Sequence, residues 1–310
     1  MATYTSLNDV DVPLIQDRYG LPDDVQIEPL KGGAANSSFM LDAESTRYVL
    51  TILDNHDYDS AMALAKHTRA LFDAGYPTTR IVPSVDGELV TLMGTRLILL
   101  KGWIDGHVAD TLDADQIRTA GSHLARLHNL PADLVPVPVR TRRLTPEHHA
   151  LIPDFADQEF AGWLQTRLAE VTEAEQGTDR ALTLCHGDLF TDNLVLADDG
   201  AVTILDWETI SLDDPVLDLG MAALGLAQVD GVLSLDRLGA LISGYATERP
   251  QICDDLGQLG TEIVHAALII AFHRYYRHNV RFPDPSKAMI HRELYAFVDS
   301  VPTTRALAVL

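Results

Sequence analysis

The sequence predicts an α+β fold with two lobes: a small N-terminal lobe rich in antiparallel strands and a larger, mainly helical C-terminal lobe. Two observations predict it. Short apolar or β-branched runs separated by turn residues fill much of the first hundred residues. After residue 217 the apolar residues recur at helical spacing, which predicts helix throughout that part of the chain. We therefore expect residues 1–103 to form a nucleotide-binding lobe and residues 104–310 a catalytic and substrate-binding lobe.

The N-terminal lobe is predicted to contain six strands and one helix. The strands are expected at residues 25–30, 38–41, 48–53, 80–83, 89–93 and 96–100. Asp86-Gly87 is a turn signal between the fourth and fifth of them. The helix is expected at residues 59–74, where apolar side chains recur every three or four positions. Gly75 and Pro77 follow its end.

The C-terminal lobe is predicted to be mostly helical. Its helices are expected at residues 111–130, 155–175, 217–227, 235–247, 256–279 and 287–301. Asp113 suits the N-cap region of the first one. Short strands are expected at residues 181–184, 194–196 and 202–205, and a turn at residues 198–200 joins the last two.

Composition and charge exclude several classes of protein. The formal charge is −22, from 23 basic and 45 acidic residues, so the chain repels nucleic acid and anionic membranes. Two cysteines are too few for a disulfide framework, and the N-terminus lacks the features of a signal peptide. The longest apolar run, residues 266–272, is too short to span a membrane. We expect a cytoplasmic monomer or homodimer that binds neither nucleic acid nor membrane.

The segment that carries chemistry is HGDLFTDN at residues 186–193, followed by ILD at residues 204–206. Phosphoryl transfer needs a group that orients the attacking hydroxyl and accepts its proton, and it needs hard oxygen ligands for Mg²⁺. Asp188 suits the first role. Asn193 and Asp206 suit the second, because a hairpin over residues 194–205 brings them together. The alternative is an ordinary polar turn.

The pattern HxDxxxxN followed by IxD resembles the catalytic and metal loops of the protein-kinase-like fold. Together with DPVLDLG at residues 214–220, it resembles the aminoglycoside phosphotransferase and choline kinase superfamily, and within it the type II homoserine kinases. The likeness covers nearly the whole chain from about residue 25. It implies ATP and Mg²⁺ as cofactors, Asp188 as catalytic base, and Asn193 and Asp206 as magnesium ligands. It also implies that Asp218 supports the catalytic loop, and we expect His186 to hold that loop as well.

Nucleotide-binding residues are expected in the N-terminal lobe. The small-residue loop KGGAANSS at residues 31–38 suits phosphate binding through backbone N–H groups, and a plain hairpin turn is the alternative. Its candidate residues are Gly32, Gly33, Ala34 and Asn36. The resemblance also places Leu100 and Gly102 where the hinge of the family contacts adenine.

One position departs from the protein kinases and from most aminoglycoside phosphotransferases. Thr51 stands where those proteins have a strand lysine, and the helix at residues 59–74 has no glutamate. Homoserine-kinase-like sequences resemble this one in having threonine there. The hypothesis is that Lys31, Lys66 or Arg69 supplies the missing charge. The alternative for each is a solvated surface position.

Four residues are candidates to bind the acceptor. Arg274 or Arg277, in the helix at residues 256–279, would pair with a carboxylate through a two-pronged contact. Asp192 or Glu208 would bind an ammonium group. The alternatives are an ordinary amphipathic helix and an acidic surface.

The sequence therefore predicts a small-molecule kinase that transfers the γ-phosphate of ATP to a hydroxyl. Homoserine is the first choice of acceptor, and another amine-bearing alcohol such as an aminoglycoside, an amino sugar or choline is the alternative. A different class stays open: a kinase-fold module that binds a ligand without turnover, which the missing lysine and glutamate favour. The intact Asp188, Asn193 and Asp206 favour catalysis instead.

Overall fold

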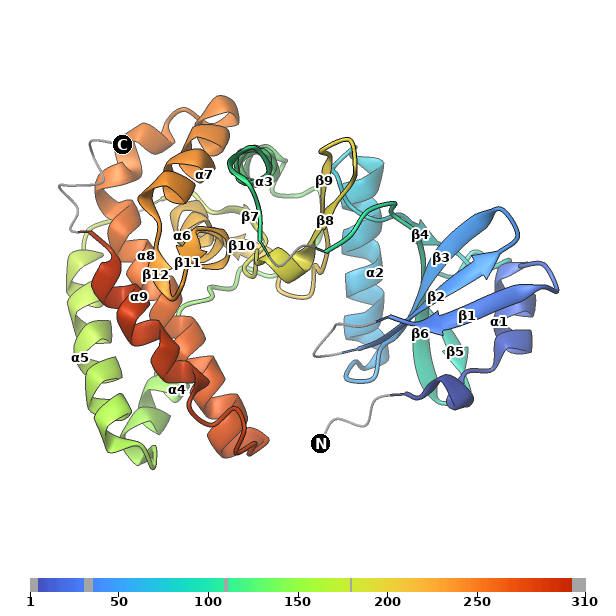
Figure 1. Cartoon of the computed structure of the whole chain (residues 1–310), viewed down its shortest axis with the longest axis horizontal. Helices are drawn as coiled ribbons and strands as arrows, with labels where there is room; N and C mark the ends of the chain where they lie inside the picture. The colour runs from blue at the N-terminus through green and yellow to red at the C-terminus, as the bar shows by residue number, and fades with distance from the viewer. Residues whose placement is uncertain (1–4, 31–35, 109–110, 179, 303–310) are drawn as a thin grey trace. The chain divides into compact units, whose positions relative to one another are not determined.

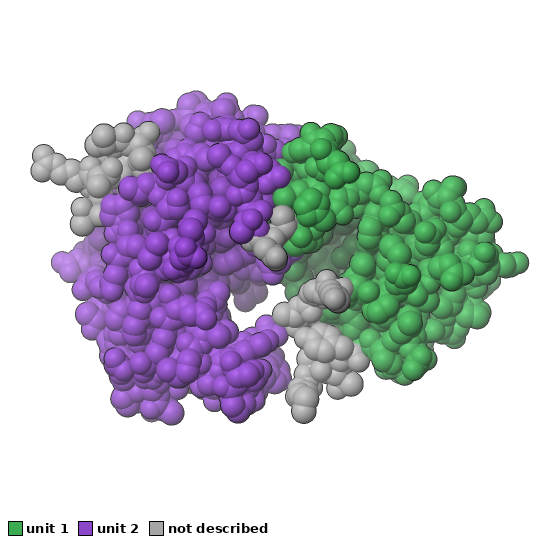
Figure 2. All heavy atoms as spheres, in the orientation of Figure 1, with its two compact units in different colours: residues 1–109, 134–136, 194–208 green, residues 110–133, 137–193, 209–310 purple. Residues whose placement is uncertain are grey.

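The computed structural model describes residues 5–30, 36–108, 111–178 and 180–302. Contacts divide the chain into two compact units, which Figure 2 colours separately. Unit 1 comprises residues 1–109, 134–136 and 194–208, and the rest of the chain forms unit 2. Unit 1 therefore includes a segment from far along the chain, 194–208. The predicted boundary at residues 103 and 104 stays a prediction.

Unit 1 is built on a six-stranded antiparallel sheet, with the strands in the order β1-β2-β3-β6-β4 and β5 also paired with β6. All six predicted strands and the predicted helix are present. In chain order the elements are α1 (Val12–Tyr19), β1 (Val25–Pro29), β2 (Ser37–Ala43), β3 (Thr46–Ile52), α2 (Tyr58–Asp73), β4 (Ile81–Val82), β5 (Thr91–Met93), β6 (Arg96–Gly102), β8 (Leu194–Leu196) and β9 (Val202–Ile204).

Helix α1 was not predicted, although its ends carry ordinary signals. Asp11 caps its N-terminus, Pro13 lies in its first turn, and Gly20 ends it in the left-handed conformation at φ 62°. With only eight residues, the helix is too short for its periodicity to be visible. Ile15 and Tyr19 join the apolar core of the sheet, so α1 covers part of that core.

Unit 2 is mostly helical, and α5, α8 and α9 lie side by side in it (Figure 1). Two pairs of short strands, β7 with β10 and β11 with β12, are both antiparallel. In chain order the elements are α3 (Ala114–Asn129), α4 (Pro146–Leu151), α5 (Gln158–Ala174), β7 (Thr183–Cys185), β10 (Ser211–Asp213), α6 (Pro215–Leu226), β11 (Gln228–Val229), β12 (Val232–Leu233), α7 (Leu235–Glu248), α8 (Ile252–Tyr275) and α9 (Leu294–Ser300).

Two expectations for the C-terminal part were wrong. The chain after residue 217 is not all helix, because β11 and β12 form a hairpin whose turn residues Asp230 and Gly231 have φ values of 50° and 81°. The helix expected at residues 287–301 begins later, with a 3₁₀ turn (Ile290–Glu293) leading into α9. Before it, the side chain of Asp284 accepts hydrogen bonds from Ser286, and this local turn competes with a helix.

The long helix α8 is the centre of unit 2. Counted to Arg281 through a π-helical turn (Tyr276–Arg281), it is long and apolar enough to cross a membrane by length and composition alone. However, 67% of its most apolar window is buried inside the protein. The core helix of a soluble protein passes the same test. Helices α5, α6 and α9 all pack against it.

Helices α3 and α7 pack closely because glycines allow their backbones to approach. A methyl group added at Gly244 of α7 would clash with the backbone carbonyl oxygen of Arg118 in α3. Likewise, one added at Gly121 of α3 would clash with the carbonyl oxygen of Leu241 in α7. This pair of contacts fixes α3, which carries the buried His128.

We expect Gly244→Ala to lower the free energy of unfolding by about 2–4 kcal/mol, because two backbones would have to separate. Gly239→Ala in the same helix is the matched control. An added methyl group meets nothing within 4 Å there, so this change should raise stability by about 0.5–1 kcal/mol. Urea unfolding of both variants measures the difference, and equal effects would contradict the close packing.

Candidate active site

The predicted catalytic loop leaves the buried strand β7 and is held by one buried carboxylate. The backbone N–H groups of His186 and Gly187 each donate a hydrogen bond of 2.7 Å to Asp218. Asp218 lies in the first turn of α6 and is 3% exposed. Gly187 has a φ of 78°, which glycine adopts without strain. A side chain from another element therefore fixes the start of the loop.

A buried histidine in turn fixes Asp218. Nε2 of His128 lies 3.0 Å from Oδ2 of Asp218, and Nδ1 lies 2.6 Å from the hydroxyl of Tyr245. Burial works to raise the pKa of Asp218, but the hydrogen bond to His128 and the one from the backbone of Gly187 help to hold it below its ordinary value. Burial lowers the pKa of His128. The neutral ring then donates to Asp218 and accepts from Tyr245, which satisfies all three groups.

Asp188 and Asn193 are joined through the backbone of the same loop. Nδ2 of Asn193 donates to the carbonyl oxygen of Asp188 at 2.8 Å, and the N–H of Phe190 donates to the same oxygen at 3.0 Å. The N–H of Asp188 donates to Nδ1 of His186 at 3.2 Å. This hydrogen bond uses the Nδ2 group of Asn193, so the other end of the amide, the oxygen Oδ1, points elsewhere. An amide oxygen is the kind of ligand that Mg²⁺ prefers.

Asp206 follows the β8–β9 hairpin in unit 1. Leu194 pairs with Ile204 in this hairpin, so Asn193, just before β8, and Asp206, just beyond β9, flank the same hairpin end. Asp206 has a φ of 64°, a conformation that residues with a side chain rarely adopt and that is common at functional sites. Its Oδ1 accepts the N–H of Glu208 at 3.3 Å.

The hairpin is anchored within unit 1. His107 and Leu196 exchange two backbone hydrogen bonds, of 3.0 and 2.9 Å, and the N–H of Ile204 donates to the carbonyl of Pro77 at 2.9 Å. Directly after Asp206, the indole of Trp207 is 1% exposed and donates to the hydroxyl of Thr78 at 2.8 Å. These contacts fix the backbone on both sides of Asp206.

Glu208 lies in a polar cluster of unit 1. Nδ2 of Asn36 donates to Oε1 of Glu208 at 2.6 Å, and Nε2 of His56 lies 3.1 Å from the same oxygen. The hydrogen bond with His56 is the main cause that lowers the pKa of Glu208. Glu208 therefore already has two protein partners, and its predicted contact with a substrate ammonium stays a prediction.

Lys101 in β6 is a candidate that sequence reasoning missed. Burial lowers its pKa, and the charges of Asp206 and Glu208 oppose that change. The charge of Lys101 therefore interacts with that of the predicted metal ligand Asp206. The sequence carries no signal for this, because Lys101 and the two carboxylates are far apart along the chain and share unit 1 only in the folded protein.

The cations that the sequence suggested have other surroundings. Lys66 is exposed on α2, and Arg69 on the same helix pairs with Asp73 at 3.5 Å. Lys31 lies outside the described residues, as do the predicted phosphate-binding residues Gly32, Gly33 and Ala34. A role for Lys66 or Arg69 at the phosphates stays a hypothesis.

Three further nucleotide candidates lie in the sheet of unit 1. Thr51 is buried, and its hydroxyl has no hydrogen-bond partner within the described part of the chain. Leu100 is fully buried. The N–H of Gly102 donates to Arg80, and its carbonyl oxygen accepts from Thr79. A contact between Gly102 and adenine therefore involves groups that already have partners, and it stays a prediction.

The other candidates for binding the acceptor lie in unit 2. Nη1 of Arg274 lies 3.4 Å from Oε2 of Glu293 and 3.4 Å from the carbonyl oxygen of Ile290. Arg277 is exposed in the π-helical turn after α8, and Asp192 is exposed in a 3₁₀ turn (Thr191–Asn193). Glu293 already balances the charge of Arg274, which makes it a weaker partner for a carboxylate.

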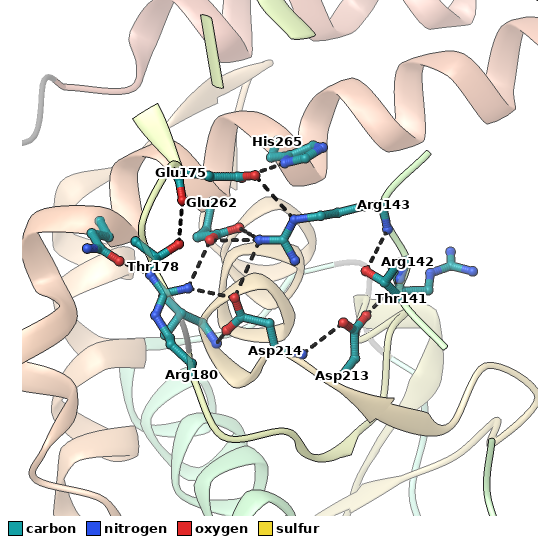
Figure 3. Close-up of polar contacts among 12 residues, drawn as sticks. Thr141, Arg142, Arg143, Glu175, Thr178, Arg180, Asp213, Asp214, Glu262 and His265 are labelled. Atoms are coloured by element: carbon teal, nitrogen blue, oxygen red, sulfur yellow. Dashed lines mark hydrogen bonds and ion pairs between the residues drawn. The ribbon is translucent and has the colours of Figure 1, made fainter. Parts of the chain in front are cut away.

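A network of charged side chains lies at the start of α6, and sequence reasoning missed it (Figure 3). Nη2 of Arg143 lies 2.8 Å from both carboxylate oxygens of Glu262. Nη1 of Arg180 donates to Asp214 at 2.6 Å and to Glu262 at 3.0 Å. Asp214 also caps α6 by accepting the N–H of Val216. The network therefore fixes the helix end that presents Asp218.

Glu175 and His265 extend this network. Oε1 of Glu175 lies 2.6 Å from Nδ1 of His265, and Oε2 lies 3.3 Å from Nε of Arg143. Glu175, Glu262 and His265 offer three possible metal-ligand atoms within 4.8 Å of one another. However, Arg143 contacts both carboxylates, so a guanidinium already balances their charge. Burial raises the pKa of Glu262 to about 7, even though Arg143 favours its ionised form.

We expect Glu262→Ala to lower the free energy of unfolding by roughly 3 kcal/mol, because two largely buried arginines would lose a shared partner. Glu170→Ala is the control. Glu170 is exposed and pairs with Arg167 on the surface of α5, so its loss should cost at most about 0.5 kcal/mol. Urea unfolding at pH 8 measures both, and a small, equal effect would show that the network does not stabilise unit 2.

Fold and loop together define a class of protein. The chain has the protein-kinase-like fold, and it carries the Asp188, Asn193 and Asp206 pattern of that fold. The model of the phosphotransferase enzyme family matches residues 26–251. The chain belongs to this family, so it is a small-molecule phosphotransferase with a hydroxyl group as acceptor.

Curated relatives are similar to the chain over most of its length, and solved structures share its fold. A homoserine kinase of Methylocella silvestris is 27% identical over 88% of this chain and 87% of its own length. A homoserine kinase of Zymomonas mobilis is 24% identical over 79% of each chain. Among solved structures, amicoumacin kinase has a TM-score of 0.70 at 14% identity, covering 94% of this chain and 93% of its own. A microcompartment-associated aminopropanol kinase has a TM-score of 0.67 at 17% identity, covering 92% and 95%.

Proposed function

We propose that the protein is a homoserine kinase, which transfers the γ-phosphoryl group of ATP to the hydroxyl of homoserine in the cytoplasm. Two observations support this. Relatives named homoserine kinase align with 79–88% of the chain. In addition, Thr51 stands at the strand position where homoserine-kinase-like sequences resemble this one in having threonine. The main observation behind the chemistry is the loop that joins Asp188 to Asn193.

In this proposal Asp188 orients the acceptor hydroxyl and accepts its proton as the oxygen attacks the γ-phosphorus. The carboxylate needs a fixed loop, and the hydrogen bonds from His186 and Gly187 to Asp218 supply it. The bond from the oxygen to phosphorus forms while the bond between that phosphorus and the β–γ bridging oxygen breaks. The products are O-phosphohomoserine and ADP.

The side chains of Asn193 and Asp206 suit a hydrated magnesium ion. Asn193 and Asp206 would hold it, because an amide oxygen and a carboxylate are hard ligands and flank the same hairpin end. Bound there, Mg²⁺ would offset the negative charge on the phosphates. The strained φ of 64° at Asp206 is consistent with a side chain that the backbone aims at a ligand.

Lys101 is our candidate for the charge that the missing strand lysine would supply. Its charge interacts with that of Asp206, beside which the nucleotide phosphates would lie in this proposal. Burial weakens its hydration, so a phosphate oxygen would be a favourable partner.

We expect Asp188→Asn to lower kcat for homoserine by at least about 100-fold, because the amide cannot accept the proton. The binding of ATP should change less than about 3-fold, since the side chain acts on the acceptor. The measurement is ADP release with Mg²⁺, together with ATP titration of the variant.

The same assay separates the alternatives. The acceptors tested are homoserine, choline, an amino sugar and an aminoglycoside. Turnover with one of the others would replace homoserine and keep the kinase. ATP binding without turnover on any acceptor would favour a ligand-binding module instead.

We expect Lys101→Met to raise KM for ATP by about 10-fold, because a charge-assisted contact with phosphate is lost. Lys287→Met, an exposed position in unit 2, is the control and should change KM less than 2-fold. Lys66→Met tests the competing candidate. A larger effect at Lys66 than at Lys101 would assign the role to α2.

A further inference from the structure

A stretch of chain before α4 runs beside the strands that carry the catalytic loop. Val139 pairs in parallel with Leu212 of β10, and the N–H of Arg140 donates to the carbonyl of Leu212 at 3.2 Å. The N–H of Arg142 donates to the carboxylate of Asp213 at 2.7 Å. Because β10 pairs with β7, and β7 leads into the loop, Arg142 is placed next to that loop.

The side chain of Arg142 lies against Gly187, the residue before Asp188. A methyl group added at Gly187 would lie 3.1 Å from Cδ and 3.3 Å from Cγ of Arg142. Figure 3 shows that this side chain points away from the network that holds Arg143 and Arg180. The side chain of Arg142 thus faces the loop.

The Nε of Arg142 is buried and has no hydrogen-bond partner within the described residues. A buried donor on a charged group is costly when it has no acceptor, so such a group in a native protein calls for an explanation. The carboxylate of Asp213 does not supply one. It accepts the backbone N–H groups of Arg142 and Asp214, at 2.7 and 2.8 Å. An anionic ligand would satisfy the guanidinium.

The charge of Arg142 also acts on a pair of histidines in unit 2. The rings of His148 in α4 and His273 in α8 are 5.4 Å apart. Burial lowers the pKa of His273 to about 4, and the charges of Arg142, His148 and Arg140 add to this effect. At neutral pH His273 is therefore neutral, and the positive charge beside Gly187 comes from Arg142.

We propose that Arg142 binds the carboxylate of the acceptor. This inference rests on the proposed kinase activity, because the acceptor hydroxyl has to lie at Asp188. In homoserine the hydroxyl oxygen and the carboxylate carbon are about 5 Å apart when the chain is extended. An acceptor of that length reaches from Asp188 to a guanidinium packed on the neighbouring Gly187. Arg142 thereby replaces Arg274, whose charge Glu293 balances.

The test compares two acceptors that differ in one group. L-Homoserine carries the carboxylate, and 3-amino-1-propanol is the same molecule without it. We expect Arg142→Gln to raise KM for homoserine by about 10- to 100-fold, because a charge-assisted hydrogen bond is lost. The kcat/KM for 3-amino-1-propanol should change less than 2-fold. Arg142→Lys keeps the positive charge but loses the paired N–H donors of the guanidinium, so it should recover part of the affinity.

Arg167→Gln is the matched control, because Arg167 is a surface arginine of unit 2 that pairs with Glu170 and Asp299. Arg167→Gln should leave KM for homoserine and kcat/KM for 3-amino-1-propanol unchanged. Thermal melting of each variant checks that it is folded. An equal loss with both acceptors would overturn the proposal, since it would mean that Arg142 only supports the loop.

Binding without chemistry separates this proposal from the proposed function. L-2-Aminobutyrate has the carboxylate of homoserine and no hydroxyl, and titration calorimetry gives its Kd. Binding at least 10-fold weaker to Arg142→Gln than to the wild type supports the carboxylate site even where no acceptor is phosphorylated. Equal binding to both proteins, or no binding to the wild type, overturns it. Absence of phosphorylation with intact aminobutyrate binding overturns the homoserine kinase assignment alone.

Discussion

The carboxylate of Asp218 is the group on which the candidate active site depends. It receives two backbone N–H groups from the start of the catalytic loop and the imidazole of His128. Each bond is buried, so each would be costly to leave unmade. The charge of Asp218 therefore fixes the loop that presents Asp188. Close packing of α3 on α7 supports this arrangement from one side, because α3 carries His128 and α7 carries Tyr245.

A second layer of charges supports α6, the helix that carries Asp218. Asp214 caps α6 and binds Arg180, which shares Glu262 with Arg143. Buried ion pairs are weak evidence for net stability, since desolvation offsets much of their attraction. Their effect here is positional, because the N-terminus of a helix with a fixed cap cannot shift relative to β7 and β10. The order of dependence runs from the network to α6, then to Asp218, and last to the loop.

Much of the fold was predictable from local patterns. The six strands of the sheet in unit 1 lie in apolar or β-branched runs between turn residues, and the long helices have clear periodicity. The glycine and proline signals at the end of α2 are also plain. The pattern around Asp188 was equally visible, because its residues are close in sequence. The helix α1 and the hairpin β11–β12 were missed because eight residues and two-residue strands carry too little periodicity. Lys101 and Glu262 were missed because their partners are distant in sequence and become neighbours only in the folded chain.

The net charge of the protein is another sequence property that does not reveal the local surroundings of a site. A formal charge of −22 suggests affinity for amines, yet net charge is an average over the whole surface and says little about one place. Arg142 escaped notice because TRR at residues 141–143 looks like a solvated basic turn. In the structure its two arginines separate: Arg143 enters the network with Glu262, whereas Arg142 lies against Gly187. Because Arg143 takes up the nearby acids, Arg142 is left for an anion that arrives with the substrate. The acidic surface would then favour the amine of an amino acid, and this local basic group would select its carboxylate.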